Sequence, residues 1–389
     1  MTFYVQHGYG KGQKLPAVLA DGNLGGVILS PGDEDPGNLG DTARFCRQAD
    51  LEVLVDPQTY LYSTQPAGRG RNHPAHELAF ERLSWAQDAR SVAAHIDRIG
   101  RLNGALNPDG LWLAPGPLQD SFADLWTPLS VQFARTASQA WGQNRTVATL
   151  AVDEAGLADW LAIERWLDVA TALPVRGFYV LVSRPSTTYP NTPWAPAKLS
   201  NLLRLIHALS ELNDFDVTWG FSDFEGLLGL AAGATAMATG WSYTLRQFSS
   251  SKWMSPASGG RAPAVRTHLA RLWSLPRAET ETAPLFASSL RSAIFTTDEI
   301  ARYSSTPFDA LGRVDAQIEH MNALAARASW LSSQPDVSSR VGTVTDSLES
   351  AVALWDSIGH TGMLPDPSYR NRVVALRDAL RLFTDQVAL

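Results

Sequence analysis

Short apolar runs alternate with amphipathic stretches along most of the chain, and turns rich in glycine, proline or aspartate follow the runs. The runs consist mostly of Val, Leu, Ile and aromatic residues without polar alternation, which is typical of strands buried on both faces of a parallel sheet. Eight segments have this character: Phe3–Gln6, Gly26–Leu29, Leu51–Val55, Gly110–Ala114, Thr146–Val152, Gly177–Val182, Phe215–Trp219 and Thr235–Ala238.

The segments between these runs carry apolar residues at three- and four-residue spacing, which predicts helices. Six are clear: Asp41–Ala49, Ser91–Leu106, Phe122–Trp141, Leu157–Leu173, Ala197–Leu212 and Phe224–Ala232. The first crossover, near Leu15–Ala20, is short. Proline cannot donate to a strand ladder, so Pro31, Pro57, Pro115 and Pro185 mark points where a strand ends and a loop begins.

Eight strand–helix units in succession predict an α/β fold of the (β/α)8 TIM-barrel type. The alternative is an open doubly wound sheet, which would need a glycine-rich phosphate-binding turn between the first strand and a helix. Gly8, Gly10 and Gly12 do follow the first strand, but with G-x-G-x-G spacing and without a clear long helix behind them. The barrel is therefore the favoured fold.

The pattern changes after Gly240, so three segments are expected along the chain. Residues 1–250 form the barrel, residues 251–308 form an irregular basic segment that packs on it, and residues 309–389 form a C-terminal helical extension. Helices are predicted at 309–333, 341–358 and 367–386. They either complete the outer layer of the barrel, which is favoured, or present a surface to a partner protein.

Composition narrows the classes of protein further. Hydrophobic residues make up 45% of the chain and charged residues 18%, a normal globular balance. Cys46 is the single cysteine, which excludes an internal disulfide and a cysteine-cluster metal site. The N-terminus lacks the pattern of a signal peptide, and no apolar run approaches the roughly 18 residues that span a bilayer. A cytoplasmic protein without a membrane partner is expected; no metal site is predicted, and the sequence does not identify a cofactor.

Catalytic residues of barrel enzymes lie at the carboxyl ends of the strands, and three carboxylates of this chain follow apolar runs there: Asp56, Asp153 and Glu154. A carboxylate at the barrel mouth can act as an acid, a base or a nucleophile. Gln58 and Tyr60 alternate with Asp56, so an extended chain would point all three side chains the same way. The structural alternatives are that Asp56 caps the turn before Pro57 and that Asp153 or Glu154 caps the next helix.

Substrate-binding candidates lie at other strand ends, namely His7 after the first strand and Asp223 after the seventh. Gly220 and Gly240 end the seventh and eighth strands, where many barrels offer backbone N–H groups to a phosphate. Glycine there also suits any tight turn, so both interpretations stay open.

Basic residues are concentrated in two loops on the same predicted face. No Asp or Glu occurs from Trp241 to Ala278, a stretch that includes Arg246, and Arg69 and Arg71 lie in a second loop without acids. In a chain of net charge −7, a basic rim favours an anionic partner such as a phosphorylated metabolite, a nucleotide or a nucleic acid. Interleaved aromatic residues, Trp241 among them, could stack on a base. The alternative is that these arginines pair with acids elsewhere and the aromatic residues belong to the core.

One short resemblance adds to this picture. Asp56 in the sequence VDPQTY, at a strand end of a barrel with a basic rim, resembles the strand-end aspartates of tRNA-guanine transglycosylases. The resemblance covers only these few residues, and the cysteine-rich zinc site of that family is absent because Cys46 stands alone. It is an analogy of fold and charge.

Two hypotheses of function follow. In the first, the chain is a transferase or hydrolase that acts on a phosphate-bearing, nucleotide-like or nucleic-acid substrate with its strand-end carboxylates. Glycosyl-bond or base-exchange chemistry is the specific form, because carboxylates and stacking aromatic residues suit an oxocarbenium-like centre. In the second, the barrel is a non-catalytic subunit that binds nucleic acid, or a protein partner through its C-terminal helices.

Overall fold

A computed structural model of the chain describes residues 2–8, 12–63, 70–79, 88–185, 189–253, 263–363 and 365–389. Within these residues all strands pair in parallel, in the order β3-β2-β1-β9-β8-β7-β6-β4, with β5 also paired to β6. The strands are β1 (Thr2–Gln6), β2 (Gly26–Leu29), β3 (Glu52–Val55), β4 (Trp112–Leu113), β5 (Leu118–Gln119), β6 (Thr146–Asp153), β7 (Gly177–Ser183), β8 (Asp216–Trp219) and β9 (Ala236–Thr239).

The predicted (β/α)8 barrel is confirmed, and each of the eight predicted runs overlaps a strand. The fourth position holds two short strands, since β4 pairs with the start of β6 and β5 with its end. Pro115 and Pro117 stand between them and cannot donate to the ladder, which explains the interruption that the sequence interpretation missed.

The barrel is nearly but not fully closed. Among the described residues, no backbone ladder joins β3 to β4. Side chains bridge this gap. The Asn107 amide donates to the Val53 carbonyl of β3, and the Trp112 indole of β4 donates to the Asn107 carbonyl at 2.8 Å. The Leu118 N–H of β5 donates to Ser63 Oγ at 2.6 Å.

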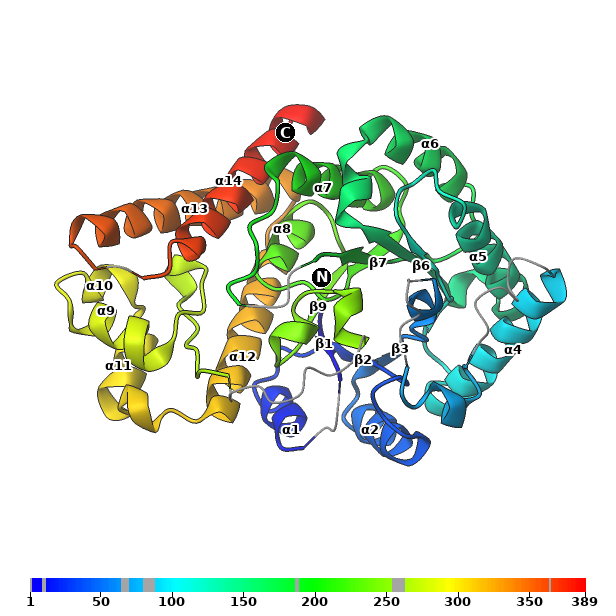
Figure 1. The fold of residues 1–389 in the computed structure, drawn as a ribbon, viewed down its shortest axis with the longest axis horizontal. Coiled ribbons are helices and arrows are strands. Elements are labelled where there is room, and N and C mark those ends of the chain that lie inside the picture. The colour runs from blue at the N-terminus through cyan, green and yellow to red at the C-terminus, as the bar shows by residue number, and fades with distance from the viewer. Residues whose placement is uncertain are drawn as a thin grey trace.

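Helices follow the strands as predicted and surround the barrel (Figure 1). Around the barrel lie α1 (Lys14–Leu19), α2 (Pro36–Gln48), α4 (Ala89–Leu106), α5 (Thr127–Trp141), α6 (Trp160–Ala170), α7 (Pro196–Ser210) and α8 (Glu225–Ala231). After β9 come α9 (Ala283–Ala287), α10 (Arg291–Ile294), α11 (Thr297–Ser305), α12 (Arg313–Ser332), α13 (Val337–His360) and α14 (Ser368–Val387).

The long helix α12 packs against β1 and lies between α1 and α8, where the helix after the last barrel strand belongs (Figure 1). Residues 240–312 separate it from β9 in sequence, yet it fills the eighth position of the outer layer. Beyond it, α13 packs on α8 and α14 on α7. The division of the chain at residues 250 and 308 stays a prediction.

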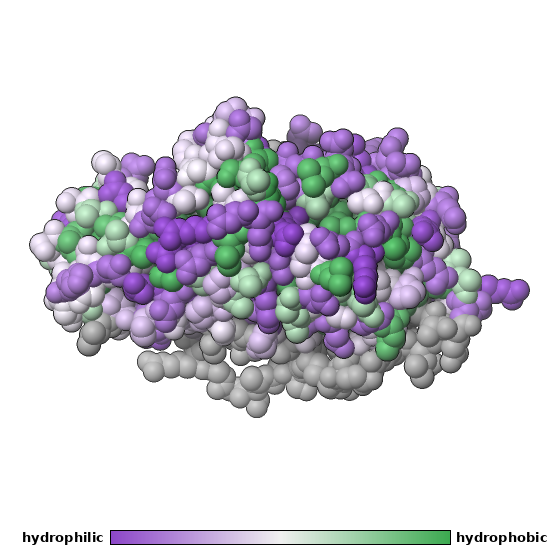
Figure 2. Space-filling model, turned by 90° about the horizontal axis from the view of Figure 1, so that it is seen from above, coloured by the Kyte–Doolittle hydropathy of each residue, from purple (hydrophilic) through white to green (hydrophobic). Residues whose placement is uncertain are grey.

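The apolar sides of the C-terminal helices are used inside the molecule. Buried residues of α12, α13 and α14, such as Leu324, Leu348 and Phe383, belong to the same hydrophobic cluster as Phe3 of β1. Figure 2 views the side formed by α14, α7 and α6, where hydrophobic side chains occur in small groups between hydrophilic ones. Over the described part of the chain, no helix is long and apolar enough to cross a membrane.

Candidate functional site at the barrel mouth

Asp56 follows the carboxyl end of β3, and its side chain is completely buried. Its Oδ1 accepts a hydrogen bond from the Gln58 N–H at 2.9 Å, and its Oδ2 accepts one from the Tyr60 hydroxyl at 2.9 Å. The hydroxyl of Tyr179, on β7, lies 3.4 Å from Oδ2 and 3.1 Å from Oε1 of Gln6. Strands from opposite sides of the barrel therefore meet at this carboxyl group.

The pKa of Asp56 reflects a balance between burial, which favours the protonated form, and the surrounding hydrogen-bond donors, which favour the ionised form. Burial raises the pKa of Asp56 to about 6, although the hydrogen bonds from Gln58, Tyr60 and Tyr179 act in the opposite direction. Burial and the adjacent carboxyl group raise the pKa of both tyrosines well above the ordinary range, so both remain protonated donors. A carboxyl group with a pKa near neutrality suits general acid–base chemistry.

The chain after β3 does not stay extended, so that part of the prediction is wrong. Gln58 adopts a left-handed backbone conformation with φ of 53°, and Thr59–Tyr62 form a 3-10 helix. This helix turns Tyr60 back toward Asp56. The two side chains therefore meet because the chain turns, and not because alternate residues of an extended strand point the same way. The bond from the Gln58 N–H to Asp56 Oδ1 is also the turn-capping role that the sequence left open.

Polar atoms without a hydrogen-bond partner occur at several strand ends of the same barrel mouth. Buried side-chain atoms at the carboxyl ends of β1, β2, β3, β5 and β9 have no hydrogen-bond partner among the described residues: Gln6 Nε2, both ring nitrogens of His7, Ser30 Oγ, Gln58 Nε2, Gln119 Nε2 and Thr239 Oγ1. A buried polar group without a partner costs about 1–3 kcal/mol, and native proteins rarely retain several in one place unless water or a ligand binds there. Water or a polar ligand at the mouth would give these atoms the hydrogen-bond partners that they lack.

Asp153 and Glu154 lie apart from this cluster. Asp153 ends β6 opposite Ser183, four residues beyond the pair Thr149–Tyr179, which is about 13 Å further along the sheet. Its Oδ1 accepts from the Ala155 N–H at 2.9 Å, the capping role that the sequence left open. Glu154 forms ion pairs with Arg184 at 2.8 Å and Lys198 at 3.8 Å. Among the described contacts, none joins Asp153 to Asp56.

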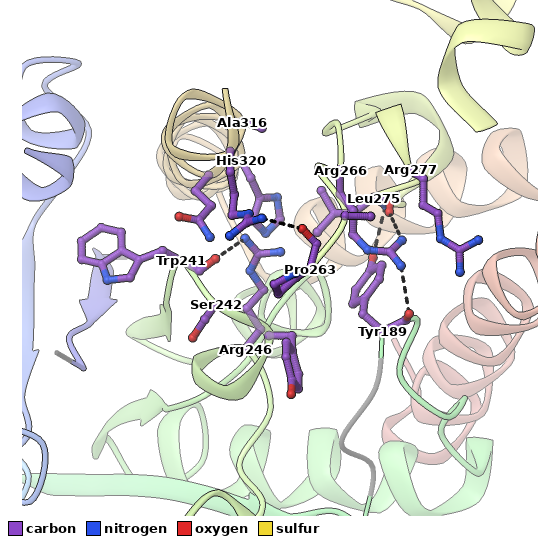
Figure 3. Close-up of a pocket in the computed structure, with 14 residues that line it drawn as sticks. Tyr189, Trp241, Ser242, Arg246, Pro263, Arg266, Leu275, Arg277, Ala316 and His320 are labelled. Atoms are coloured by element: carbon purple, nitrogen blue, oxygen red, sulfur yellow. Dashed lines mark hydrogen bonds between the residues drawn. The ribbon is translucent and has the colours of Figure 1, made fainter. Parts of the chain in front are cut away.

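A pocket of about 420 Å³ lies between the loop after β9, residues 263–277 and the start of α12. Figure 3 shows Trp241, Arg246 and His320 on one side of it and Tyr189, Arg266 and Arg277 on the other. Arg313 of α12 also lines it, and no acidic side chain is among its lining residues. The loop after β9, the last barrel strand, borders it, and this loop is one of the two that commonly form the phosphate site of the fold.

Arg246 is fixed at the base of this pocket. It is 7% exposed, and its Nε and Nη2 donate to the carbonyls of Gly240 and Trp241, both at 2.9 Å. No described group accepts a hydrogen bond from its Nη1. Burial lowers the pKa of Arg246, whereas the nearby Asp223 carboxylate acts in the opposite direction. A guanidinium held in this way is preorganised to bind an anion.

Asp223 belongs to a buried chain of three residues behind the pocket wall. Its Oδ1 accepts from Nε2 of His320 at 2.9 Å, and Nδ1 of His320 lies 2.9 Å from Nδ1 of His268. Burial and the charge of Arg246 lower the pKa of His320 to about 4, so the ring is neutral at pH 7. His320 therefore donates to Asp223 and accepts from His268. These two hydrogen bonds use both ring nitrogens of His320. His320 orients the wall and has no ring nitrogen left for a substrate.

The two predicted glycines have different surroundings. The Gly220 N–H donates to the Val180 carbonyl at 3.0 Å, so it is not available to a phosphate as the sequence interpretation proposed. A Cβ atom at Gly220 would lie 2.5 Å from the Tyr179 ring, which is why glycine is needed there. Gly240 precedes Trp241, which lines the pocket, and the Gly240 carbonyl accepts from Arg246.

His7 joins the mouth to the pocket. Its ring contacts the Trp241 ring edge-on, with 6.1 Å between centroids, and its Nδ1 lies 3.6 Å from Glu34. Burial lowers the pKa of His7 to about 4, and the positive charge of Lys14 acts in the same direction. Of the second basic loop, Arg71 is exposed and Arg69 lies outside the described residues.

Several site residues were not found from the sequence. Gln6 and Tyr179 lie inside apolar runs, where only the direction of the side chain distinguishes a mouth residue from a core residue. His268 and His320 come from segments without a local motif, and the fold alone brings them to Asp223. Within the ranges that the structure describes, no three His, Cys, Asp or Glu side chains are grouped closely enough to hold a metal ion.

Comparisons with known proteins add little to this geometry. No family model matches the chain, and no curated protein matches it. Among solved structures, the chain is similar to one described as a probable tagatose 6 phosphate kinase from Sinorhizobium meliloti, with 11% identity over 99% of each chain and a TM-score of 0.35. A similarity this weak carries no argument about activity, so the interpretation of the site depends on its own residues.

Proposed function

We propose that the chain is a barrel enzyme that acts on a phosphate-bearing, nucleotide-like substrate and uses Asp56 as its reactive carboxyl group. The observation that carries this proposal is the environment of Asp56, which is fully buried, has a pKa raised to about 6, and lies among unpartnered polar atoms of Gln6, Ser30 and Gln58. A purely structural aspartate needs its own partners, but it does not need unused donors and acceptors around it.

Glycosyl-bond or base-exchange chemistry fits these groups best. The bond between the sugar carbon and its base breaks, and positive charge develops on that carbon. The ionised Asp56 stabilises this charge, while Tyr60 and Tyr179 fix the orientation of the carboxylate. An incoming base, or water in a hydrolysis, then forms the new bond to the carbon and gives up a proton, which the departing base takes up. The Nε2 atoms of Gln6 and Gln58, which lack partners, can donate to acceptors on the polar edge of a base.

The roles proposed for Asp153 and Glu154 are weaker. Glu154 is engaged by Arg184 and Lys198, and Asp153 is separated along the barrel from Asp56. Asp153→Asn is therefore the matched control for Asp56→Asn, because both change one strand-end carboxylate into its amide.

The test incubates the protein with each common nucleoside 5′-monophosphate and the matching isotopically labelled free base, and measures released base and incorporated label. Wild type and Asp153→Asn should turn over one of these substrates, and Asp56→Asn should lose at least about 100-fold of the rate. Turnover by folded Asp56→Asn at the wild-type rate would reject the role of Asp56. No turnover by any variant, together with binding of nucleic acid or a protein, would favour the non-catalytic subunit.

A further inference from the structure

The pocket beside Trp241 gathers positive charge, and the described carboxylate that acts on Arg246 is Asp223, buried behind the pocket wall. Arg246 and Arg313 line the pocket, and the Lys14 ammonium lies 5.6 Å from the centre of the Trp241 ring. Burial lowers the pKa of Lys14, and the charge of Arg313 acts in the same direction, so these two cations are close enough to repel each other. No described carboxylate forms an ion pair with Lys14, Arg246 or Arg313. Such a group of like charges is stabilised by a bound anion.

The hydrogen bonds of Arg246 and Arg313 leave each side chain able to bind an anion. Arg313 is exposed and uses Nη2 to donate to the Pro263 carbonyl at 2.8 Å, while no described group accepts from its Nη1. Arg246 donates from Nε and Nη2 to backbone carbonyls, and its Nη1 stays available to donate to a ligand. The N–H groups of Arg246 and Arg313 match the oxygens of a phosphate dianion, and the Lys14 ammonium at the Trp241 ring adds positive charge nearby.

Trp241 and Gly240 lie between this pocket and the barrel mouth. Trp241 lines the pocket and touches His7, whose two ring nitrogens have no hydrogen-bond partner. The backbone of Gly240 lies so close to β1 that a Cβ atom there would be 2.7 Å from the Gln6 carbonyl. His7 and Gln6 of the mouth are thus direct neighbours of Trp241 and Gly240 at the edge of the pocket.

From this geometry we infer that the pocket binds the 5′-phosphate of a single nucleotide through Arg246, Arg313 and Lys14, while the base occupies the mouth between β1 and β3. The inference takes its substrate class from the proposed function, but the charges of the pocket do not depend on Asp56. A cavity of about 420 Å³ is in the range of small-molecule sites.

Isothermal titration calorimetry tests this with nucleoside 5′-monophosphates, the corresponding nucleosides and inorganic phosphate. Wild type should bind a monophosphate at least about tenfold more tightly than the nucleoside or inorganic phosphate, because each supplies only part of the contacts. Arg313→Ala should weaken monophosphate binding about tenfold and reduce its salt dependence, with nucleoside binding unchanged. Arg246→Gln should show the same pattern. The control is Arg101→Ala, an exposed arginine on α4.

Two results would overturn the inference, namely equal affinity for nucleoside and monophosphate, or monophosphate binding that Arg313→Ala leaves unchanged. Asp56→Asn separates this inference from the proposed function, because it should bind the monophosphate normally and fail only in turnover. If Arg313→Ala loses binding while Asp56→Asn keeps full turnover, the phosphate site stands and the role of Asp56 is rejected. If the reverse holds, the role of Asp56 stands and the phosphate site is rejected.

Discussion

The carboxyl group of Asp56 should leave a signature in the pH dependence of stability. Its folded-state pKa is raised from 3.8 to about 6, so the protonated group favours the folded state and this stabilisation is lost as pH rises through about 6. The shift corresponds to roughly 3 kcal/mol of unfolding free energy. Between pH 4 and 7, wild type should therefore lose roughly that much stability relative to Asp56→Asn, as measured by urea unfolding.

Buried histidines change the pH dependence of stability in the opposite direction, so wild type has to be compared with Asp56→Asn. Burial lowers the pKa of His7, His73 and His320 to about 4, so the unfolded chain takes up their protons first and stability falls as pH drops below about 6.5. Both proteins share this effect, which cancels in the difference. Asp41→Asn, an exposed change on α2, controls for the loss of a carboxylate. Parallel curves for wild type and Asp56→Asn would show that the Asp56 pKa is not raised.

Site prediction from sequence worked where a residue directly follows an apolar run. Asp56, Trp241 and Arg246 were found in this way, because the end of a strand and a gap in acidic residues are local signals. The partners Tyr179 and His320 gave no such signal. Their roles depend on the direction of a side chain from β7 and on the register of α12, which only tertiary packing determines.

At the scale of elements, Gly220 tests how closely the end of β8 packs on β7. A Cβ atom at Gly220 would lie 2.5 Å from Tyr179 and 2.7 Å from Leu181. Gly220→Ala should therefore displace the Tyr179 ring from Asp56 and lower the unfolding free energy by about 1–3 kcal/mol. Thermal or urea unfolding measures the change.

Gly342 provides the matched comparison for the same substitution. It lies inside α13, and no atom comes within 4 Å of the position that a Cβ would take. Gly342→Ala should raise stability by about 0.5–1 kcal/mol, because alanine favours the helix more than glycine does. Equal effects of the two changes would mean that Gly220 is not a close-packing position.

Most strands and helices were predictable because hydrophobic periodicity is strong in parallel sheets and amphipathic helices. The interrupted fourth strand was not, since a second pairing segment of two residues after Pro117 is too short to form a pattern. The place of α12 was also unpredictable, because residues 240–312 intervene and periodicity does not show which surface a helix covers.

For the whole molecule, the shared core predicts that the barrel and the C-terminal helices unfold together. Leu324 of α12 is fully buried in the hydrophobic cluster that includes β1 and α14. Leu324→Ala should lower the unfolding free energy by about 3 kcal/mol and shift one single calorimetric transition. Trp330→Ala, at a position on the same helix that is 51% exposed, should change stability by less than about 0.5 kcal/mol. Two transitions, of which Leu324→Ala moves only one, would show an independent C-terminal unit.

The central claim is that Asp56 is a buried carboxyl group, poised near neutral pH, at the place where a nucleotide binds. The most direct measurement is a pH titration of aspartate carboxyl carbons by NMR, in which the Asp56 signal is assigned by its absence from Asp56→Asn. The account predicts an apparent pKa of about 6 that shifts when a nucleoside 5′-monophosphate is added. An Asp56 carboxyl group that titrates near 4 and does not respond to any of these nucleotides would contradict it.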